Sequence, residues 1–216
     1  MNKRNFIKEF TAIKKIIKNS TPYIERIPKK DPFKILIGCV LSTRTRDEIT
    51  EKVCSRLLSE YDTPSKILSL DTKKLERLIY PVGFYKKKAI LLKEICVQII
   101  KDFKGKVPST KHQLLQIRGV GPKCANLVLS LAFKKCEVCV DTHVHRISNR
   151  LGWTETKTPL QTEQKLKDIF PSAYLPQINT YLVIFGKNIC KPLHPQCKNC
   201  ILNRVCKYHK NKEVKL

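Results

Sequence analysis

The sequence predicts an all-α protein built from many short helices. Apolar residues recur at intervals of three and four along most of the chain, which is the spacing of one helix face, and no segment alternates like a strand. Helix-starting pairs such as Asp31-Pro32 and Thr63-Pro64 interrupt this pattern at short intervals. A chain of 216 residues, 42% of them hydrophobic, has enough material for more than one core. Many short helices favour two helical lobes over one long bundle.

The expected helices of the first half can be justified in chain order. Residues 4–19 place Phe6, Phe10 and Ile13 on one face, and Thr21-Pro22 should end this helix. Asp31 is an N-cap and Pro32 a first helical residue, so an apolar helix is expected over 33–41. Further helices are expected around 49–57, after Pro64, over 72–80 and from 85 to 103, separated by the polar break 42–47 and the turn 81–84.

The stretch Leu114–Val128 then predicts a helix, a tight turn and a second helix. Gly119, Val120 and Gly121 form the turn, in which glycine permits positive φ and a close approach by another backbone. The second helix begins at Pro122 with Lys123 beside its unpaired amides, and such a helix end favours anions. From this stretch alone, a hairpin that holds a nucleic-acid backbone and an ordinary helical corner are equally supported.

The second half is also expected to be helical, over roughly 142–151, 160–169 and 178–188. Asp141 follows the apolar Val138-Cys139-Val140 and precedes the first of these helices. Its simplest role is therefore an N-cap, a role compatible with a further one in catalysis.

The charge of the chain indicates a polyanionic partner. Its 43 Lys and Arg exceed its 18 Asp and Glu by 25, and an excess this large suggests DNA or RNA. A general bias toward lysine is the competing explanation. No signal peptide and no membrane-spanning apolar run is visible, so we expect a cytoplasmic protein that meets no membrane.

Four of the ten cysteines are clustered near the C-terminus. Cys190, Cys197, Cys200 and Cys206 follow the spacing C-x6-C-x2-C-x5-C, which suits either a tetrahedral zinc or a cubane iron–sulfur cluster. Lys191 is one of several basic residues around them and would offset cluster charge, touch phosphate or only solvate the loop. The other six cysteines are scattered among apolar neighbours and are expected to be small buried side chains.

Three motifs in this order resemble the endonuclease III family of DNA base-excision glycosylases, within the helix–hairpin–helix superfamily. They are the Gly119-Val120-Gly121 hairpin with Lys123, the segment Val140-Asp141-Thr142-His143, and the cysteine spacing. The resemblance covers nearly the whole chain. It implies one four-iron, four-sulfur (4Fe-4S) cluster and a DNA-binding cleft between two lobes. One lobe would be a six-helix block of residues 25–134 with the hairpin at about 113–128; the other would combine 1–24 with 135–216 and carry the cluster at 190–206.

The same resemblance assigns catalytic roles. Lys123 matches the lysine that forms a Schiff base with the sugar, and Asp141 matches the aspartate that works beside it. A lysine that merely contacts phosphate is the simpler reading of Lys123. His143 matches a residue near the family's active site, although a histidine at a helix start is more often structural.

Two further positions align with family loops that enter the duplex when a base is flipped out. Arg44 lies in the polar break, and Phe84 in the turn before a long helix is a plausible apolar wedge. Arg44 departs from the glutamine common in bacterial members. Arg118 and Pro122 depart from the family's residues on either side of the hairpin.

The resemblance implies a bifunctional DNA glycosylase and AP lyase that removes oxidised pyrimidines such as thymine glycol. Its partner would be double-stranded DNA with a damaged base or an abasic site, and it would act as a monomer. A mismatch glycosylase of the same superfamily and a non-catalytic nucleic-acid-binding protein with a structural zinc are the alternatives. Lys123 and the stop at Leu216 argue against the mismatch enzymes, which typically lack this lysine. Lys123 together with Asp141 argues against the non-catalytic protein.

Overall fold

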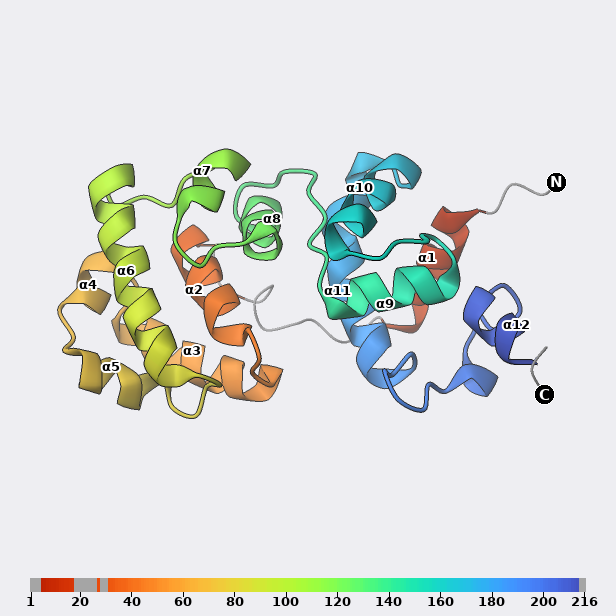
Figure 1. Ribbon diagram of the computed structural model, residues 1–216, viewed down its shortest axis with the longest axis horizontal. Helices are drawn as coiled ribbons and strands as arrows, with labels where there is room; N and C mark the ends of the chain where they lie inside the picture. The colour runs from red at the N-terminus through yellow and green to blue at the C-terminus, as the bar shows by residue number, and fades with distance from the viewer. Residues whose placement is uncertain (1–4, 18–26, 28–30, 214–216) are drawn as a thin grey trace. The chain divides into compact units, whose positions relative to one another are not determined.

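The computed structural model describes residues 5–17, 27 and 31–213, and within these ranges the chain is all-α, as expected (Figure 1). The described residues form twelve α-helices, short 3-10 turns and no strand. The helices are α1 (Phe6–Ile16), α2 (Pro32–Ser42), α3 (Asp47–Glu60), α4 (Pro64–Leu68), α5 (Thr72–Ile79), α6 (Tyr85–Phe103), α7 (Lys111–Gln116), α8 (Pro122–Leu131), α9 (Thr142–Leu151), α10 (Pro159–Ile169), α11 (Leu175–Asn188) and α12 (Lys207–Glu213).

The chain divides into two compact units. Residues 22–135, here called the central unit, form one of them. Residues 1–21 and 136–216 together form the other, here called the terminal unit. The terminal unit is therefore assembled from both ends of the chain.

Helix α2 is the centre of the central unit. Eight of its eleven residues are buried, because it is apolar on every side and packs against α3, α6 and α8. Its start is fixed by Asp31, whose Oδ1 accepts hydrogen bonds from the backbone amides of Phe33 and Lys34, as an N-cap should. The long helix α6 packs in turn on α4 and α5.

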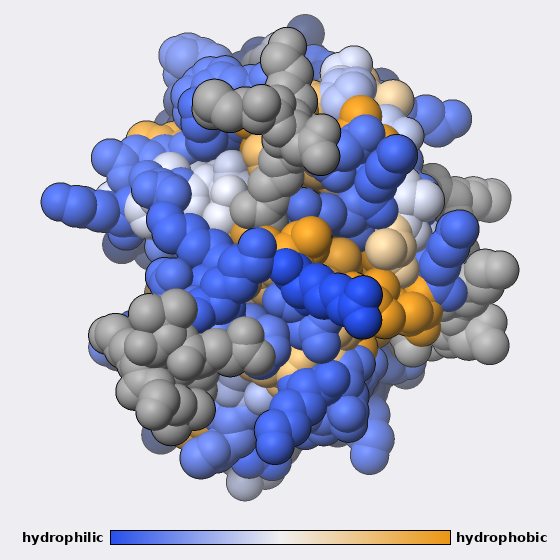
Figure 2. Space-filling view, turned by 90° about the vertical axis from the view of Figure 1, so that its right-hand side faces the viewer, coloured by the Kyte–Doolittle hydropathy of each residue, from blue (hydrophilic) through white to orange (hydrophobic). Residues whose placement is uncertain are grey.

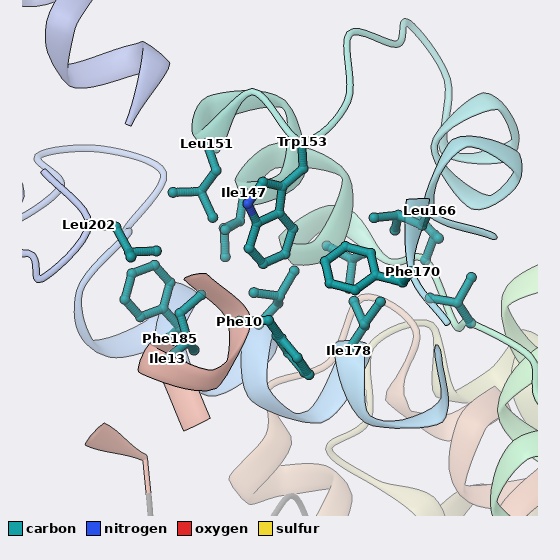
Figure 3. Packing of buried hydrophobic residues seen from close by; sticks show 14 of the residues in the cluster. Phe10, Ile13, Ile147, Leu151, Trp153, Leu166, Phe170, Ile178, Phe185 and Leu202 are labelled. Atoms are coloured by element: carbon teal, nitrogen blue, oxygen red, sulfur yellow. The ribbon is translucent and has the colours of Figure 1, made fainter. Parts of the chain in front are cut away.

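Aliphatic side chains and the aromatic rings of Phe10, Trp153, Phe170 and Phe185 form the core of the terminal unit (Figure 3). Phe10 of α1 is fully buried and makes edge-to-face contacts with Trp153 and Phe170 at centroid distances of 6.3 and 5.9 Å. The indole N–H of Trp153 donates to the buried carboxylate of Glu9 at 2.6 Å. The N-terminal helix is thus built into the core formed by α9, α10 and α11.

The structure differs from the sequence-based expectation at the end of the first helix and at three cysteines. The first helix ends at Ile16, although it was expected to run to residue 19, and the stop expected at Thr21-Pro22 lies outside the described residues. Cys39 and Cys124, expected as separate thiols, are joined as a disulfide between α2 and α8. The two helices pack face to face and bring the Cα atoms within 5.8 Å, a distance that a disulfide spans. Cys136, expected to be buried, is exposed in the segment between α8 and α9.

The surface seen in one view is mostly hydrophilic. On the face seen in Figure 2, hydrophilic side chains predominate, and hydrophobic ones form a patch from the centre toward the right with smaller spots elsewhere. No helix in the described part of the chain has both the length and the apolar character required to cross a bilayer.

Candidate functional site

The glycine turn connects α7 to α8 and lies close against α6. Gly119 has φ +74°, and a Cβ added there would lie 2.8 Å from the Leu91 side chain of α6. The positive φ therefore favours glycine at this position, and any larger residue would also have to displace the Leu91 side chain.

The side chain of Gln98 on α6 fixes the turn further. Its Nε2 donates to the carbonyl of Gln116 at 2.9 Å, and its Oε1 accepts from the amide of Arg118 at 3.0 Å. The Arg118 guanidinium also pairs with Glu94 at 2.8 Å. Sequence reasoning missed Gln98, because its partners lie 18 and 20 residues further along the chain.

Gly121 does not use the positive φ that glycine permits. Its φ is −91°, an ordinary value, and a Cβ placed there would meet no atom within 4 Å. Nothing within the described protein therefore demands glycine at position 121. The exposed surface of the turn is open to close approach by another molecule at this point.

Lys123 is the second residue of α8, directly after Pro122. No side chain caps the start of this helix, since its N-cap is Gly121. The first amides of α8 are thus available to an anion, and the half-buried Lys123 adds a positive charge beside them.

Asp141 caps α9 in the terminal unit. Its Oδ1 accepts from the backbone amides of His143 and Val144, both at 2.9 Å. The N-cap role is therefore confirmed. Because both of these bonds use Oδ1, they leave Oδ2 to face other groups.

His143 lies against α11, where its surroundings indicate a structural role. A Cβ added at Gly186 would be 2.5 Å from His143 Nδ1, so the imidazole lies almost in contact with the α11 backbone. The same nitrogen lies 3.3 Å from the Arg146 guanidinium, which donates to the carbonyl of Cys190 at 3.0 Å.

The four C-terminal cysteines line one pocket, whose enclosed volume is about 20 Å³. Cys190, Cys197, Cys200 and Cys206 line it together with Arg150 of α9. Among the described residues, no three His, Cys, Asp or Glu side chains gather tightly enough to hold a single metal ion. The four thiols therefore line one shared space but do not converge on a single point.

Arg150 holds the start of this cysteine loop. It donates to the carbonyls of Lys191 at 2.7 Å and Pro192 at 2.8 Å, and its Nη1 lies 3.6 Å from the Cys190 sulfur. The side chain of Lys191 remains exposed. Burial raises the pKa of the Cys206 thiol, and negative charge on Cys190 and Cys197 raises it further. Four thiolates would therefore need a compensating positive charge in the pocket.

Arg44 and Phe84 come together in the central unit, although they are 40 positions apart in the numbering. The Arg44 guanidinium lies 5.4 Å from the centroid of the Phe84 ring. Both side chains are exposed. A cation–π contact between exposed groups is a weak attraction, of about 0.5–1 kcal/mol.

A model of the HhH-GPD superfamily, described as base excision DNA repair proteins, matches residues 37–172, which is more than half of the chain. The chain belongs to the HhH-GPD superfamily. Within this superfamily it is 43% identical to endonuclease III of Thermotoga maritima over 193 residues, covering 88% of this chain and 91% of that protein.

Two further relatives within the superfamily agree with this result. The chain is 40% identical to endonuclease III homolog 2, chloroplastic, of Arabidopsis thaliana over 83% of its own length, but it spans only 49% of that protein. It also matches the structure of a trapped endonuclease III–DNA covalent intermediate, an estranged-adenine complex. That match has a TM-score of 0.89 at 31% identity and covers 99% of this chain and 100% of the other.

Proposed function

We propose that this protein is a bifunctional DNA glycosylase and AP lyase of base excision repair, with oxidised pyrimidines in duplex DNA as its substrates. The observation that carries the proposal is the turn at Gly119–Gly121, which presents open backbone and an uncapped helix start next to Lys123. The similarity to endonuclease III over most of the chain supports the same reaction.

The turn is suited to hold a DNA backbone without reading its sequence. A phosphate can approach Gly121 closely, because no Cβ stands in its way and no atom of the described protein fills that space. The uncapped amides of α8 supply hydrogen-bond donors to the phosphate oxygens. The excess of 25 positive charges favours the same partner.

Lys123 is proposed as the nucleophile. Its neutral amine would attack C1′ of the flipped nucleotide, and the bond from C1′ to the base would break as the base leaves with the bonding electrons and takes up a proton. Loss of a proton from the amine nitrogen and opening of the sugar would give an imine. The imine acidifies the C2′ proton, and removal of that proton expels the 3′ phosphate by β-elimination, which cleaves the strand.

Asp141 is proposed to stabilise the positive charge that develops on the sugar. Its Oδ1 is held by two backbone amides, so the carboxylate is fixed in orientation before the substrate binds. A preorganised charge of this kind lowers the barrier without reorganising during the reaction.

Borohydride trapping tests the nucleophile. Wild-type protein should form a covalent complex with a duplex that carries thymine glycol or an abasic site, because borohydride reduces the imine to a stable amine. Lys123→Gln should form none. Lys106→Gln is the matched control, since it removes an exposed lysine from the same unit and should trap like the wild type. Equal trapping by wild type and Lys123→Gln would show that another amine does the chemistry.

A strand-cleavage assay over a panel of damaged duplexes, scored with and without alkali, tests the reaction type. Cleavage without alkali at thymine glycol supports the proposal. Base removal only from a mismatch, with strand cleavage only after alkali, would favour a monofunctional mismatch glycosylase instead.

The four cysteines are proposed to hold one 4Fe-4S cluster. The donor set fits, because Cys190, Cys197, Cys200 and Cys206 line one pocket and four cysteine thiolates are the ligands of such a cluster. When bound, the cluster would supply the positive iron charge that these thiolates require and would fix the loop beside α9. Purified protein should be brown with broad visible absorbance, and Cys200→Ala should lose both. A colourless wild type containing stoichiometric zinc would overturn this assignment.

Arg44 and Phe84 are proposed to enter the duplex at the place of the flipped base. Phe84 would stack between neighbouring bases, while Arg44 would face the base left without a partner. Lys191 would lie near the DNA backbone through its exposed side chain. His143 is proposed to contact the bound DNA near the start of α9, while its Nδ1 stays against α11.

A further inference from the structure

Two segments of the central unit that are distant in sequence are held together as one body. The segment 42–46 follows α2, and the turn 80–84, which contains a cis peptide bond between Tyr80 and Pro81, precedes α6. The Gly83 backbone passes so close to the Arg44 carbonyl that an added Cβ would lie 2.3 Å from its oxygen. The amide of Gly83 also donates to Thr45 Oγ1 at 3.2 Å. Neither segment can therefore move without the other.

Each segment holds its key side chain on an unusual backbone. Arg44 has φ +50° and Phe84 has φ +59°, both in the left-handed region that side chains other than glycine rarely adopt. Such conformations persist only where the surrounding structure enforces them, and they gather at functional positions. Since both side chains are exposed, contacts elsewhere in the two segments must enforce these backbone angles.

Lys88 provides the enforcing contacts. It is 6% exposed, and among the lysines whose burial the structure describes it is the only buried one. Its ammonium donates to the carbonyl of Leu41 at 2.8 Å, to the carbonyl of Thr43, and to Thr45 Oγ1 at 3.3 Å. One buried charge thus binds the end of α2, the segment with Arg44 and, through the shared Thr45 hydroxyl, the turn with Phe84.

The position of Lys88 is electrostatically favourable for holding the end of α2 and unfavourable for its own helix α6. Lys88 lies in the first turn of α6, the end of a helix that disfavours positive charge. The carbonyls that it reaches are at the C-terminal end of α2, where the helix dipole favours a cation. The ammonium therefore replaces the water or capping residue that would otherwise satisfy these carbonyls.

We propose that Lys88 is a positioning residue that preassembles Arg44 and Phe84 into one wedge. This inference rests on the proposed function. The wedge must fill the gap in the duplex as the damaged base leaves the stack, and two side chains already joined need no further ordering at that moment. Lys88 does not touch the DNA and acts only through the two wedge side chains.

Lys88→Met tests the proposal, because methionine has similar length and no charge. The rate of strand cleavage at thymine glycol in a duplex should fall about tenfold under single-turnover conditions. Cleavage at an abasic site in a single-stranded oligonucleotide should stay within about twofold of wild type, since no base stack has to be opened there. Lys88→Arg keeps the charge and the donors and should recover part of the duplex rate.

The decisive comparison repeats Lys88→Met in the background Arg44→Ala/Phe84→Ala. If Lys88 acts through the wedge, Lys88→Met should lower the cleavage rate little further in that background, because the side chains that it positions are already gone. An equal loss in both backgrounds, or an equal loss on single-stranded DNA, would show that Lys88 only supports the fold and would overturn the proposal. A cleavage rate on duplex DNA equal to that of the wild type would also overturn it.

Thr45→Val is the second variant, for the case in which Lys88→Met does not fold. It removes the hydroxyl that joins Lys88 to Gly83 and keeps the shape of the half-buried side chain. It should show the same selective loss on duplex DNA, and a wild-type rate would again count against the wedge. A wild type that cleaves none of the damaged DNAs would refute the proposed function itself, so the two failures are distinguishable.

Discussion

Gly83→Ala is the sharpest test of the contact between the two wedge-bearing segments. The added Cβ would lie 2.3 Å from the Arg44 carbonyl oxygen, whereas ordinary contacts begin at 3.4 Å. The segments would therefore have to separate by about 1 Å. The obstacle is backbone on both sides, so no flexible side chain can yield to relieve the overlap.

The expected cost follows from this geometry. Overpacking against a fixed neighbour typically destabilises a protein by about 1–3 kcal/mol. For a chain of this size, each kcal/mol lowers the melting temperature by about 2–4 °C, so a decrease of roughly 2–12 °C is expected. Thermal unfolding followed by circular dichroism measures it. The hydrogen bond from the Gly83 amide to Thr45 and the contact between Arg44 and Phe84 should weaken at the same time.

Gly121→Ala is the matched control for stability. Its φ of −91° suits alanine, and its Cβ would meet no atom within 4 Å. The small loss expected at an N-cap and the small gain from a stiffer unfolded chain leave a change below about 1 kcal/mol. Equal melting temperatures for the two alanine variants would refute the claim that Gly83 is required by close packing.

Two further predictions concern buried charges, one in each unit. Burial lowers the pKa of Lys88 from 10.5 to about 8, and the nearby Cys54 only partly opposes this shift. Between these pH values the unfolded chain therefore binds a proton that the folded chain does not. The free energy of unfolding of the wild type, relative to Lys88→Met, should therefore rise from pH 8 to pH 10.5, by up to about 3 kcal/mol in urea titrations; a constant difference would contradict this. In the terminal unit, Glu9→Leu should cost about 1–3 kcal/mol because it leaves the Trp153 N–H without its acceptor, whereas Glu9→Gln retains an acceptor and should cost less. Trp153 is the only tryptophan, so its fluorescence reports this loss directly, and equal stability of the two variants would disprove the role of the bond.

Local signals in the sequence predicted most of the helices. Asp31 and Asp71 mark helix starts because a capping side chain bonds to amides only two or three residues away. The turn at Gly119 and the cap at Asp141 were predicted for the same reason. Interactions between residues so close in sequence can be predicted from the sequence alone.

The contacts that build the wedge could not be predicted from neighbouring residues. Lys88 looks like one of three solvated lysines at a helix start, and only the fold shows that its partners lie 43 to 47 residues earlier. Gly83 looks like a turn glycine, although the reason for it is the passing backbone of Arg44. Gln98 and the Cys39–Cys124 pair were missed for the same physical reason, since their roles depend on how helices pack.

The assembly of the terminal unit from both ends of the chain has a consequence for synthesis on the ribosome. The Glu9 carboxylate meets its indole partner 144 residues later, so α1 emerges long before the core that buries Phe10 exists. The central unit is continuous in sequence and can fold as it emerges, while α1 must wait with an exposed apolar face. We therefore expect truncated nascent chains to contain a folded central unit and an N-terminal helix exposed to chaperones.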